Sequence, residues 1–363
     1  MQCESPQCIR LSKAADILLG FSYGKFYRNA FPFTINILLH FNSGCIANCL
    51  YCGQAREVAS SAICKTLIRV EWPLRPLENV IERISRFIGN GTSFRPYRIC
   101  VSDIEHPRAV EAEIEVVHRL WSRLGIPISV LISPTQFSKE HMKELKNAGA
   151  ERIGVALDCA TKELFEILRG FRARSPHTWE RYMEGVNEAV EVMGPGKVGI
   201  HLIVGLGETE EEAVKLIQLM HDSGVETHLF SFYPEQGSIL EKWLRPPISQ
   251  YRRVQLARYL INNNLSRYEW MRFNSKGHII DFGITSTELN DIIETGLPFV
   301  TSGCPGCNRP YANERPSEFP RNFPYIPRKQ EIEKIKKQLS TYISIDNNIN
   351  TLKKHLAMVY NHE

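Results

Sequence analysis

The chain has 363 residues, 43% of them hydrophobic and 23% charged, so it can bury a large core as one or two domains. Its net charge of +4 is too small to predict a nucleic-acid partner. There is no signal-peptide pattern and no apolar run near the ~18 residues of a membrane span, so we expect a cytoplasmic protein without a membrane partner. In that compartment, ten cysteines favour metal or redox chemistry over a disulfide framework.

Apolar segments of strand length alternate with amphipathic segments of helix length. Strands are expected at 33–41, 97–103, 126–133, 151–158, 197–207 and 226–234. Helices are expected at 77–88, 109–125, 138–150, 161–170, 178–194 and 209–224. This alternation predicts parallel strands joined by right-handed crossovers, in either an open doubly wound sheet or a partial barrel. Both folds place the active site at the carboxyl ends of the strands.

Three cysteines follow the first predicted strand: Cys45, Cys49 and Cys52, in the spacing C-x3-C-x2-C, with Tyr51 before the last. A closed structural site for zinc or an iron–sulfur cluster uses four protein ligands. Three thiolates on one loop leave a coordination position open, which is typical of a reactive centre. The alternative is a zinc knuckle with a distant fourth ligand.

A C-x3-C-x2-C loop after the first of six βα units resembles the radical S-adenosylmethionine (SAM) superfamily, particularly its biotin synthase branch. The resemblance implies an enzyme with a partial (βα)6 TIM-type barrel. It also implies that the three thiolates bind a [4Fe–4S] cluster whose fourth iron is chelated by SAM. An electron from such a cluster cleaves SAM to a radical that abstracts hydrogen from a carbon atom.

The same resemblance implies roles for residues that follow the later strands. The SAM-binding residues that it implies are Tyr51, Ser102, Asp103, Asp158, Arg181, Gly205 and Glu208. An arginine such as Arg181 suits the SAM carboxylate because its two N–H groups meet a carboxylate in parallel. Two alternatives stay open: Asp158 as a helix cap and Arg181 in a surface ion pair.

Two further cysteine pairs lie near the ends of the chain, Cys3 with Cys8 and Cys304 with Cys307. Together they supply the four thiolates of a second, auxiliary [4Fe–4S] cluster. The alternatives are a zinc site at the C-terminal pair and an incidental N-terminal pair. Cys64, Cys100 and Cys159 are interpreted as small core residues.

The two pairs and the tail CPGCNRPYANERP resemble the lipoyl synthases, most of all one component of the two-protein archaeal-type enzyme. The resemblance implies sulfur insertion into an octanoyl chain, and a tail secured over the barrel mouth by Arg309 and Arg315. It also implies three partners: an octanoylated carrier protein or lipoyl domain, a second radical SAM component, and a reductase or ferredoxin. One alternative is a biotin-synthase-like enzyme without sulfur transfer. The other is a zinc-binding, non-catalytic module.

The sequence divides into three predicted parts. Residues 1–30 form an N-terminal arm with a cysteine pair, 31–240 the barrel core, and 241–363 a C-terminal extension with the C-x2-C pair and a helical tail.

Overall fold

The computed structural model describes residues 3–58, 66–89, 96–343 and 348–360, so Cys64 lies outside the described residues. Six parallel strands form its centre: β2 (Thr34–Leu39), β6 (Arg98–Ser102), β7 (Ile128–Ile132), β8 (Ala150–Asp158), β9 (Val198–Val204) and β10 (Val225–Ser231). Each pairs in parallel with the next, which confirms the predicted partial (βα)6 barrel and all six predicted strands.

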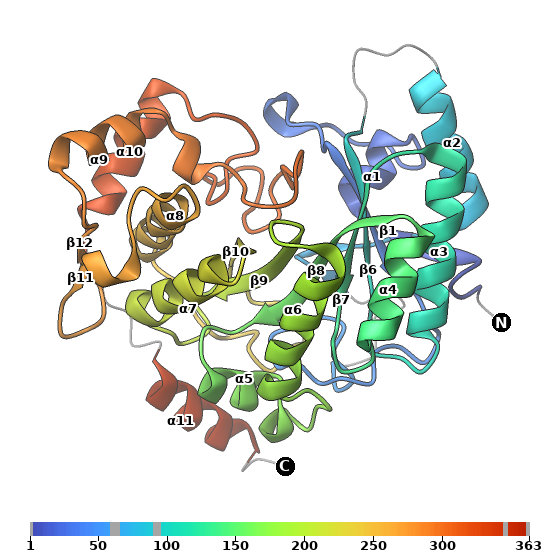
Figure 1. Ribbon diagram of the computed structural model, residues 1–363, viewed down its shortest axis with the longest axis horizontal. Helices are drawn as coiled ribbons and strands as arrows, with labels where there is room; N and C mark the ends of the chain where they lie inside the picture. The colour runs from blue at the N-terminus through green and yellow to red at the C-terminus, as the bar shows by residue number, and fades with distance from the viewer. Residues whose placement is uncertain (1–2, 59–65, 90–95, 344–347, 361–363) are drawn as a thin grey trace.

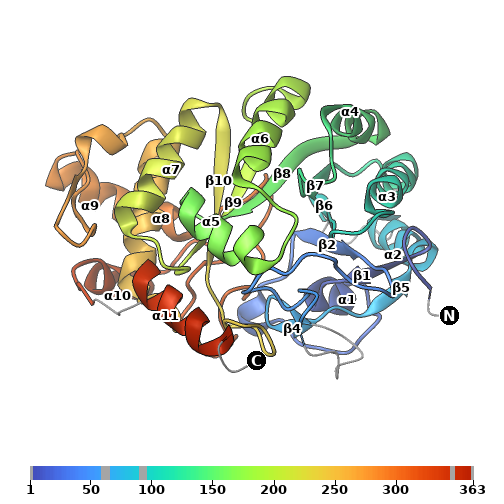
Figure 2. The same cartoon turned by 90° about the horizontal axis from the view of Figure 1, so that it is seen from below.

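Helices cover the outside of these strands (Figures 1 and 2). They are α2 (Leu77–Gly89), α3 (Ala109–Leu124), α4 (Lys139–Ala148), α5 (Lys162–Leu168), α6 (Trp179–Met193), α7 (Glu210–Asp222) and α8 (Ile248–Asn262). Side-chain oxygens of Ser138, Thr161, Thr178 and Thr209 accept backbone N–H bonds at the starts of α4, α5, α6 and α7. Local capping therefore begins α4, α5 and α7 after the strands that precede them, and α6 after the turn that follows α5.

The N-terminal arm extends the sheet beyond β2. Its strand β1 (Cys8–Leu11) pairs antiparallel with both β2 and β5 (Leu74–Pro76), and α1 (Lys13–Leu18) follows it. A 3-10 turn, η1 (Tyr27–Asn29), precedes β2, and a short hairpin of β3 (Thr66–Leu67) and β4 (Val70–Glu71) precedes β5. The predicted elements did not include these strands because they are short and lack a clear alternation.

The C-terminal part packs against α7 and α8. A 3-10 turn within the barrel, η2 (Phe171–Ala173), lies between α5 and α6. The elements of the C-terminal part are η3 (Tyr268–Trp270), β11 (Arg272–Phe273), β12 (Ile279–Asp281), α9 (Ser286–Glu294), η4 (Leu297–Phe299), α10 (Lys329–Leu339) and α11 (Ile349–Tyr360). Arg253 of α8 forms a buried ion pair with Glu210 of α7 at 2.6 Å and also donates to Thr341 O, after α10, at 2.7 Å, which ties this part to the barrel.

The segment 300–323, the C-terminal tail, bridges the open side of the barrel between β10 and the amino end of β2, ahead of the part of β2 that pairs with β1. The Ser302 hydroxyl accepts from Leu229 N of β10 at 2.7 Å. Asn308 Oδ1 accepts from Phe33 N, just before β2, at 2.9 Å. The tail was expected to lie over the mouth, whereas these bonds place its cysteine-containing part along the open side and at the amino ends of the strands.

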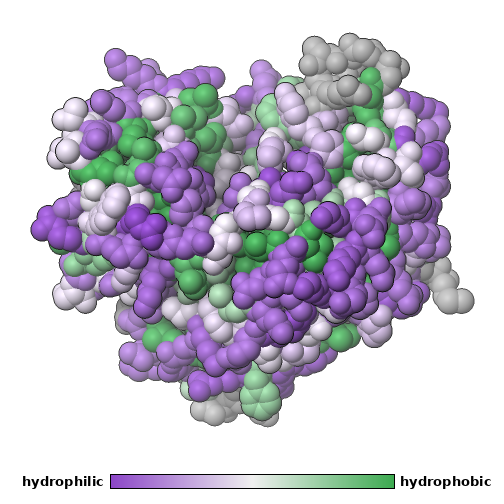
Figure 3. Space-filling view, in the orientation of Figure 1, coloured by the Kyte–Doolittle hydropathy of each residue, from purple (hydrophilic) through white to green (hydrophobic). Residues whose placement is uncertain are grey.

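The face seen in Figure 3 is mostly hydrophilic, with separate apolar patches. Within the described residues, no helix is both long and apolar enough to cross a bilayer.

Candidate active site

The cysteine loop, residues 40–58, lies at the carboxyl end of β2 and is fixed by backbone hydrogen bonds. Ile46 N donates to Glu105 O after β6 at 2.9 Å, and Leu50 N donates to Leu168 O at the end of α5 at 2.8 Å. Leu240 N, beyond β10, donates to Leu50 O at 3.0 Å. Two strand-to-helix connections and the end of α5 thus position the loop, as predicted for a site at this end of the barrel.

The thiols of Cys45, Cys49 and Cys52 lie close together: Cys49 raises the pKa of Cys45, and both raise the pKa of Cys52. Burial is the main cause: it raises the pKa of Cys45 to about 12 and that of Cys49 to about 11, and it also raises the pKa of Cys52. Because metal centres bind thiolates, occupation of this site must release protons.

The arrangement of the three thiols distinguishes between two kinds of metal centre. In the described parts of the chain, no three His, Cys, Asp or Glu side chains are grouped to hold one metal ion. Ligands of one zinc ion each lie about 2.3 Å from it and so sit close together. Thiolates of an iron–sulfur cluster bind different irons and are spread wider. Three mutually interacting thiols without a single-ion arrangement fit the cluster better than the zinc knuckle.

A buried network faces the cysteine loop from β8 and α5. The Tyr51 hydroxyl donates to Asp158 Oδ2 at 2.6 Å. The guanidinium of Arg169 binds Asp158 Oδ2 at 2.5 Å and donates to the Tyr182 hydroxyl at 2.8 Å. It also donates to Ala156 O. Asp158 has φ 64, and Thr161 rather than Asp158 caps α5. The helix-cap alternative for Asp158 is therefore wrong, and Asp158 lies in this buried network.

Arg169 is the buried arginine of this site, and the sequence interpretation did not find it. The predicted residue, Arg181, donates instead to Pro134 O and Phe137 O, both at 2.9 Å, and pairs with Glu188 at 2.7 Å. Its guanidinium is engaged by a loop and by its own helix, so the structure does not place Arg181 in the network. The one sequence signal for Arg169 was its position as a basic residue directly after the apolar last turn of the predicted helix 161–170.

Carboxyl groups after β6 form the opposite side of the site. Asp103 Oδ2 accepts from Gln136 Nε2 at 2.8 Å and Ser133 N at 3.2 Å, and burial raises the pKa of Asp103 to about 6. Glu105, which was not predicted, accepts from the Ser133 hydroxyl. Burial raises the pKa of Glu105 to about 8, and its charge acts on the thiols of Cys45 and Cys49.

Ser102 points elsewhere. It lies next to the thiol of Cys100 inside the barrel rather than in the Asp103 group.

Gly205 and Glu208 build the turn after β9. The Glu208 carboxylate accepts from Gly205 N at 2.6 Å and from Leu206 N at 2.9 Å. Gly205 has φ 109, and a Cβ there would lie 2.5 Å from Pro246 Cδ. Both residues shape the backbone at the predicted SAM-binding edge, and the Glu208 side chain is bound to its own loop.

The two terminal cysteine pairs do not meet. Cys3 and Cys8 form a disulfide, and Ser5 N between them donates to His40 O beyond the carboxyl end of β2. The Cys307 thiol lies beside Thr34, at the amino end of β2. The strand Thr34–Leu39 separates these places by about 16 Å. The prediction of one cluster shared by both pairs is wrong, because a single cluster cannot span that distance and a disulfide offers no thiolates.

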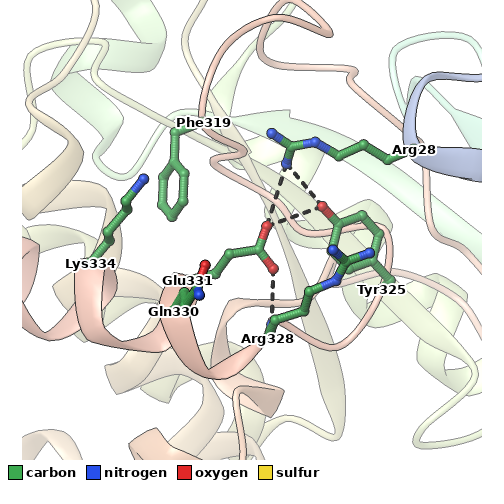
Figure 4. A pocket seen from close by; sticks show the side chains of 7 residues that line it. All are labelled: Arg28, Phe319, Tyr325, Arg328, Gln330, Glu331 and Lys334. Atoms are coloured by element: carbon green, nitrogen blue, oxygen red, sulfur yellow. Dashed lines mark hydrogen bonds and ion pairs between the residues drawn. The ribbon is translucent and has the colours of Figure 1, made fainter.

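A surface pocket of about 270 Å³ lies elsewhere, between η1 and the start of α10 (Figure 4). Arg28, Tyr325 and Glu331 interact across it. It contains none of the predicted site residues.

The chain was compared with known proteins. Residues 39–220, half of the chain, match the Radical SAM superfamily. The chain belongs to the radical SAM superfamily. Members of this superfamily bind a [4Fe–4S] cluster and SAM, and the predicted cluster ligands Cys45, Cys49 and Cys52 lie within the matched residues.

Curated relatives include biotin synthase from Aquifex aeolicus (strain VF5), 26% identical over 208 residues. The match covers 55% of this chain and 55% of that protein. A probable GTP 3′,8-cyclase from Saccharolobus solfataricus is 32% identical over 122 residues, 33% of this chain and 37% of that protein. The chain thus spans about half the length of the biotin synthase that it matches. This similarity confirms the predicted likeness to the biotin synthase branch.

Among solved structures, methylornithine synthase (PylB) is similar with a TM-score of 0.49 and 16% identity, over 70% of this chain and 66% of that one.

Proposed function

We propose that this radical SAM enzyme inserts sulfur into an octanoyl chain to make lipoyl groups, as one component of a two-protein lipoyl synthase of the archaeal type. The observation that carries the radical chemistry is the fixed three-thiol loop facing the Tyr51–Asp158–Arg169 network. The observation that favours sulfur insertion is a further set of thiols, Cys304 and Cys307, at the amino ends of the barrel strands. The tail around them resembles that of the two-protein enzyme.

When bound, cluster and SAM supply a 5′-deoxyadenosyl radical: one electron from a reduced ferredoxin-type donor breaks a C–S bond of SAM and methionine leaves. For each sulfur, a C–H bond of the octanoyl chain breaks and its hydrogen goes to the deoxyadenosyl carbon. An auxiliary cluster, for which Cys304 and Cys307 would be ligands, would supply the sulfide for the new C–S bond and would take up the electron that bond formation releases. Two such events account for both sulfurs of a lipoyl group.

The side chains of this protein bind and orient the reactants. Tyr51 and Arg169 both bond to Asp158 Oδ2, so they fix the carboxylate and leave Oδ1 as an acceptor for the ribose hydroxyls of SAM. Arg169 is a buried cation next to these groups, suited to a carboxylate of SAM. The carboxyl oxygens of Asp103 and Glu105 lie on the other side of the site and are acceptors for an amino group of SAM.

The partners proposed for this reaction are an octanoylated carrier protein or lipoyl domain, a second radical SAM component, and a reductase or ferredoxin. The carrier must present its chain at the carboxyl ends of the strands. A short-chain carrier peptide can therefore replace the carrier protein in a first assay.

The test uses the anaerobically reconstituted chain with SAM, a reductant and an octanoylated carrier peptide, alone and with the second component. We expect 5′-deoxyadenosine together with a thiolated peptide by mass spectrometry, and neither product from the Cys49→Ala variant. 5′-Deoxyadenosine with no thiolated peptide under either condition would overturn sulfur insertion and favour an enzyme without sulfur transfer. A colourless zinc protein that leaves SAM intact would overturn the radical chemistry as well.

A further inference from the structure

A second surface pocket, of about 280 Å³, lies at the free edge of β10. It is bordered by residues 226–228 in the amino half of β10, by the carboxyl end of α8, by Leu297 of η4 and by residues 300–303 of the C-terminal tail. We call it the β10–α8 pocket. It contains none of the residues placed at the candidate active site, which lies at the carboxyl ends of the strands. A ligand in this pocket therefore binds away from SAM.

Arg258 of α8 places a guanidinium at this pocket without a protein partner. Within the described residues, no hydrogen bond or ion pair reaches it. Its Nε atom is enclosed by protein, whereas its two terminal nitrogens are not enclosed and face the pocket that Arg258 lines. Burial lowers the pKa of Arg258 to about 10, so the group is charged at neutral pH. A buried cation without an acceptor is costly unless a ligand supplies one.

The missing partner is a property of this position and not of the helix. Two other arginines of α8 are buried, and both are bonded: Arg252 Nε donates to Gln338 Oε1 at 3.0 Å, and Arg253 pairs with Glu210 at 2.6 Å. These two arginines hold elements of the protein together. Arg258 is instead suited to an acceptor from outside the chain.

Two further polar groups of the pocket have unused hydrogen-bonding capacity. Asn262 stands four residues after Arg258 and so lies on the same face of α8. In the described chain neither its Oδ1 nor its amide nitrogen has a hydrogen-bond partner, and only the Oδ1 atom is enclosed. The hydroxyl of Thr227, a residue that is 1% exposed, is also without a partner there. Arg258 and Asn262 therefore offer N–H donors to one ligand, with Thr227 beside them.

The charge of the surroundings favours a ligand with one negative charge. Glu226, the acidic residue among those that line the pocket, is bound by Arg152 at 2.6 Å and lies 3.4 Å from Nε2 of His228. Burial lowers the pKa of His228, so its ring is neutral at pH 7. Glu226 and Arg152 offset each other, and Arg258 leaves one positive charge. A carboxylate matches that charge and accepts two parallel N–H bonds from a guanidinium, whereas a phosphate brings up to about two negative charges close to Glu226.

We infer that the β10–α8 pocket binds a small monocarboxylate with a short hydrocarbon part. The carboxylate accepts from Arg258 and Asn262. The hydrocarbon part packs on Leu297 and Val300, the apolar wall of the pocket, where Leu297 is 40% exposed and is stabilised by being covered. The ligand then connects α8 and the start of the tail to the edge of β10. This inference does not depend on the proposed function.

The test is a titration of the anaerobically reconstituted protein with sodium butanoate, measured as Tm by scanning calorimetry and as heat by isothermal titration calorimetry. Butan-1-ol, sodium phosphate and sodium chloride are the ligand controls. A ligand that binds only the folded state raises Tm as its concentration rises. We expect a saturable rise with butanoate and none with the three controls.

Three variants locate the site. We expect Arg258→Met to abolish the response to butanoate without lowering Tm in its absence, because it removes a cation that has no partner within the described protein. Asn262→Leu should weaken butanoate binding at least tenfold. The matched control, Arg267→Met, removes a more exposed arginine that pairs with Asp222, and it should leave the response to butanoate unchanged.

An unaltered chain without a saturable response to butanoate would overturn the inference. A response that persists in Arg258→Met, or that is lost equally in Arg267→Met, would overturn the site. A saturable response to phosphate alone, lost in Arg258→Met, would overturn the carboxylate as the ligand class. If Arg258→Met does not fold, unchanged butanoate affinity in Asn262→Leu would overturn the site in its place.

Discussion

Replacing Arg169 with methionine tests the buried network at the candidate active site. Methionine preserves much of the volume but removes a cation that binds Asp158, Tyr51 and Tyr182. Removing one partner of a buried ion pair typically costs about 3–5 kcal/mol, because the other charge is left without compensation. We therefore expect the free energy of unfolding to fall by about that amount.

The corresponding shift in melting temperature follows from the size of the chain. With about 2.1 cal/mol/K of unfolding entropy per residue, 363 residues give about 0.76 kcal/mol/K. A loss of 3–5 kcal/mol then lowers Tm by about 4–7 °C in anaerobic calorimetry. Formation of 5′-deoxyadenosine should also fall at least tenfold, with a raised KM for SAM, because Asp158 loses the group that positions it.

The matched control is Arg181→Met, whose arginine is a quarter exposed and bonds to backbone carbonyls and surface glutamates. Water can replace those bonds, so we expect a loss of about 1 kcal/mol and a Tm shift of about 1–2 °C. SAM cleavage should be close to that of the unaltered protein. If Arg181→Met reduced SAM cleavage more than Arg169→Met did, the assignment of Arg169 to the site would be refuted and the sequence interpretation restored.

Two further predictions concern the turn after β9. Gly205→Ala should lower the free energy of unfolding by about 1–3 kcal/mol, because the new methyl group meets Pro246 and the backbone has φ 109. Urea unfolding measures this change. An unchanged midpoint of unfolding would contradict the prediction. Burial raises the pKa of Glu208 to about 7 from an ordinary value of 4.5. The folded state therefore binds more protons than the unfolded state between these two pH values. The free energy of unfolding should fall by up to about 3 kcal/mol as pH rises from about 4.5 to about 7. Glu208→Gln should flatten this part of the stability profile, and equal slopes for both proteins would show that another group is responsible.

The sequence alone determined the order and type of the central elements. The segment 151–158 and its five counterparts are apolar runs of strand length, and serine or threonine residues such as Thr209 mark the helix starts that follow. These signals lie in residues adjacent in the chain, so they survive without tertiary information. The spacing of Cys45, Cys49 and Cys52 is local in the same sense, because a short loop must bring its own thiols together.

Only the tertiary structure decided which distant side chains meet. Arg169 and Arg181 both stand near helix ends, and packing alone turns the first toward Asp158 and the second toward Pro134. The sequence predicted that Cys8 and Cys307 bind the same cluster. Antiparallel pairing of β1 with β2 instead places Cys8 at the carboxyl end of β2, and the C-terminal tail places Cys307 at its amino end. The direction of Cys100 depends on which face of β6 the helices cover. Such outcomes are set by contacts between residues far apart in the chain, and no local pattern encodes them.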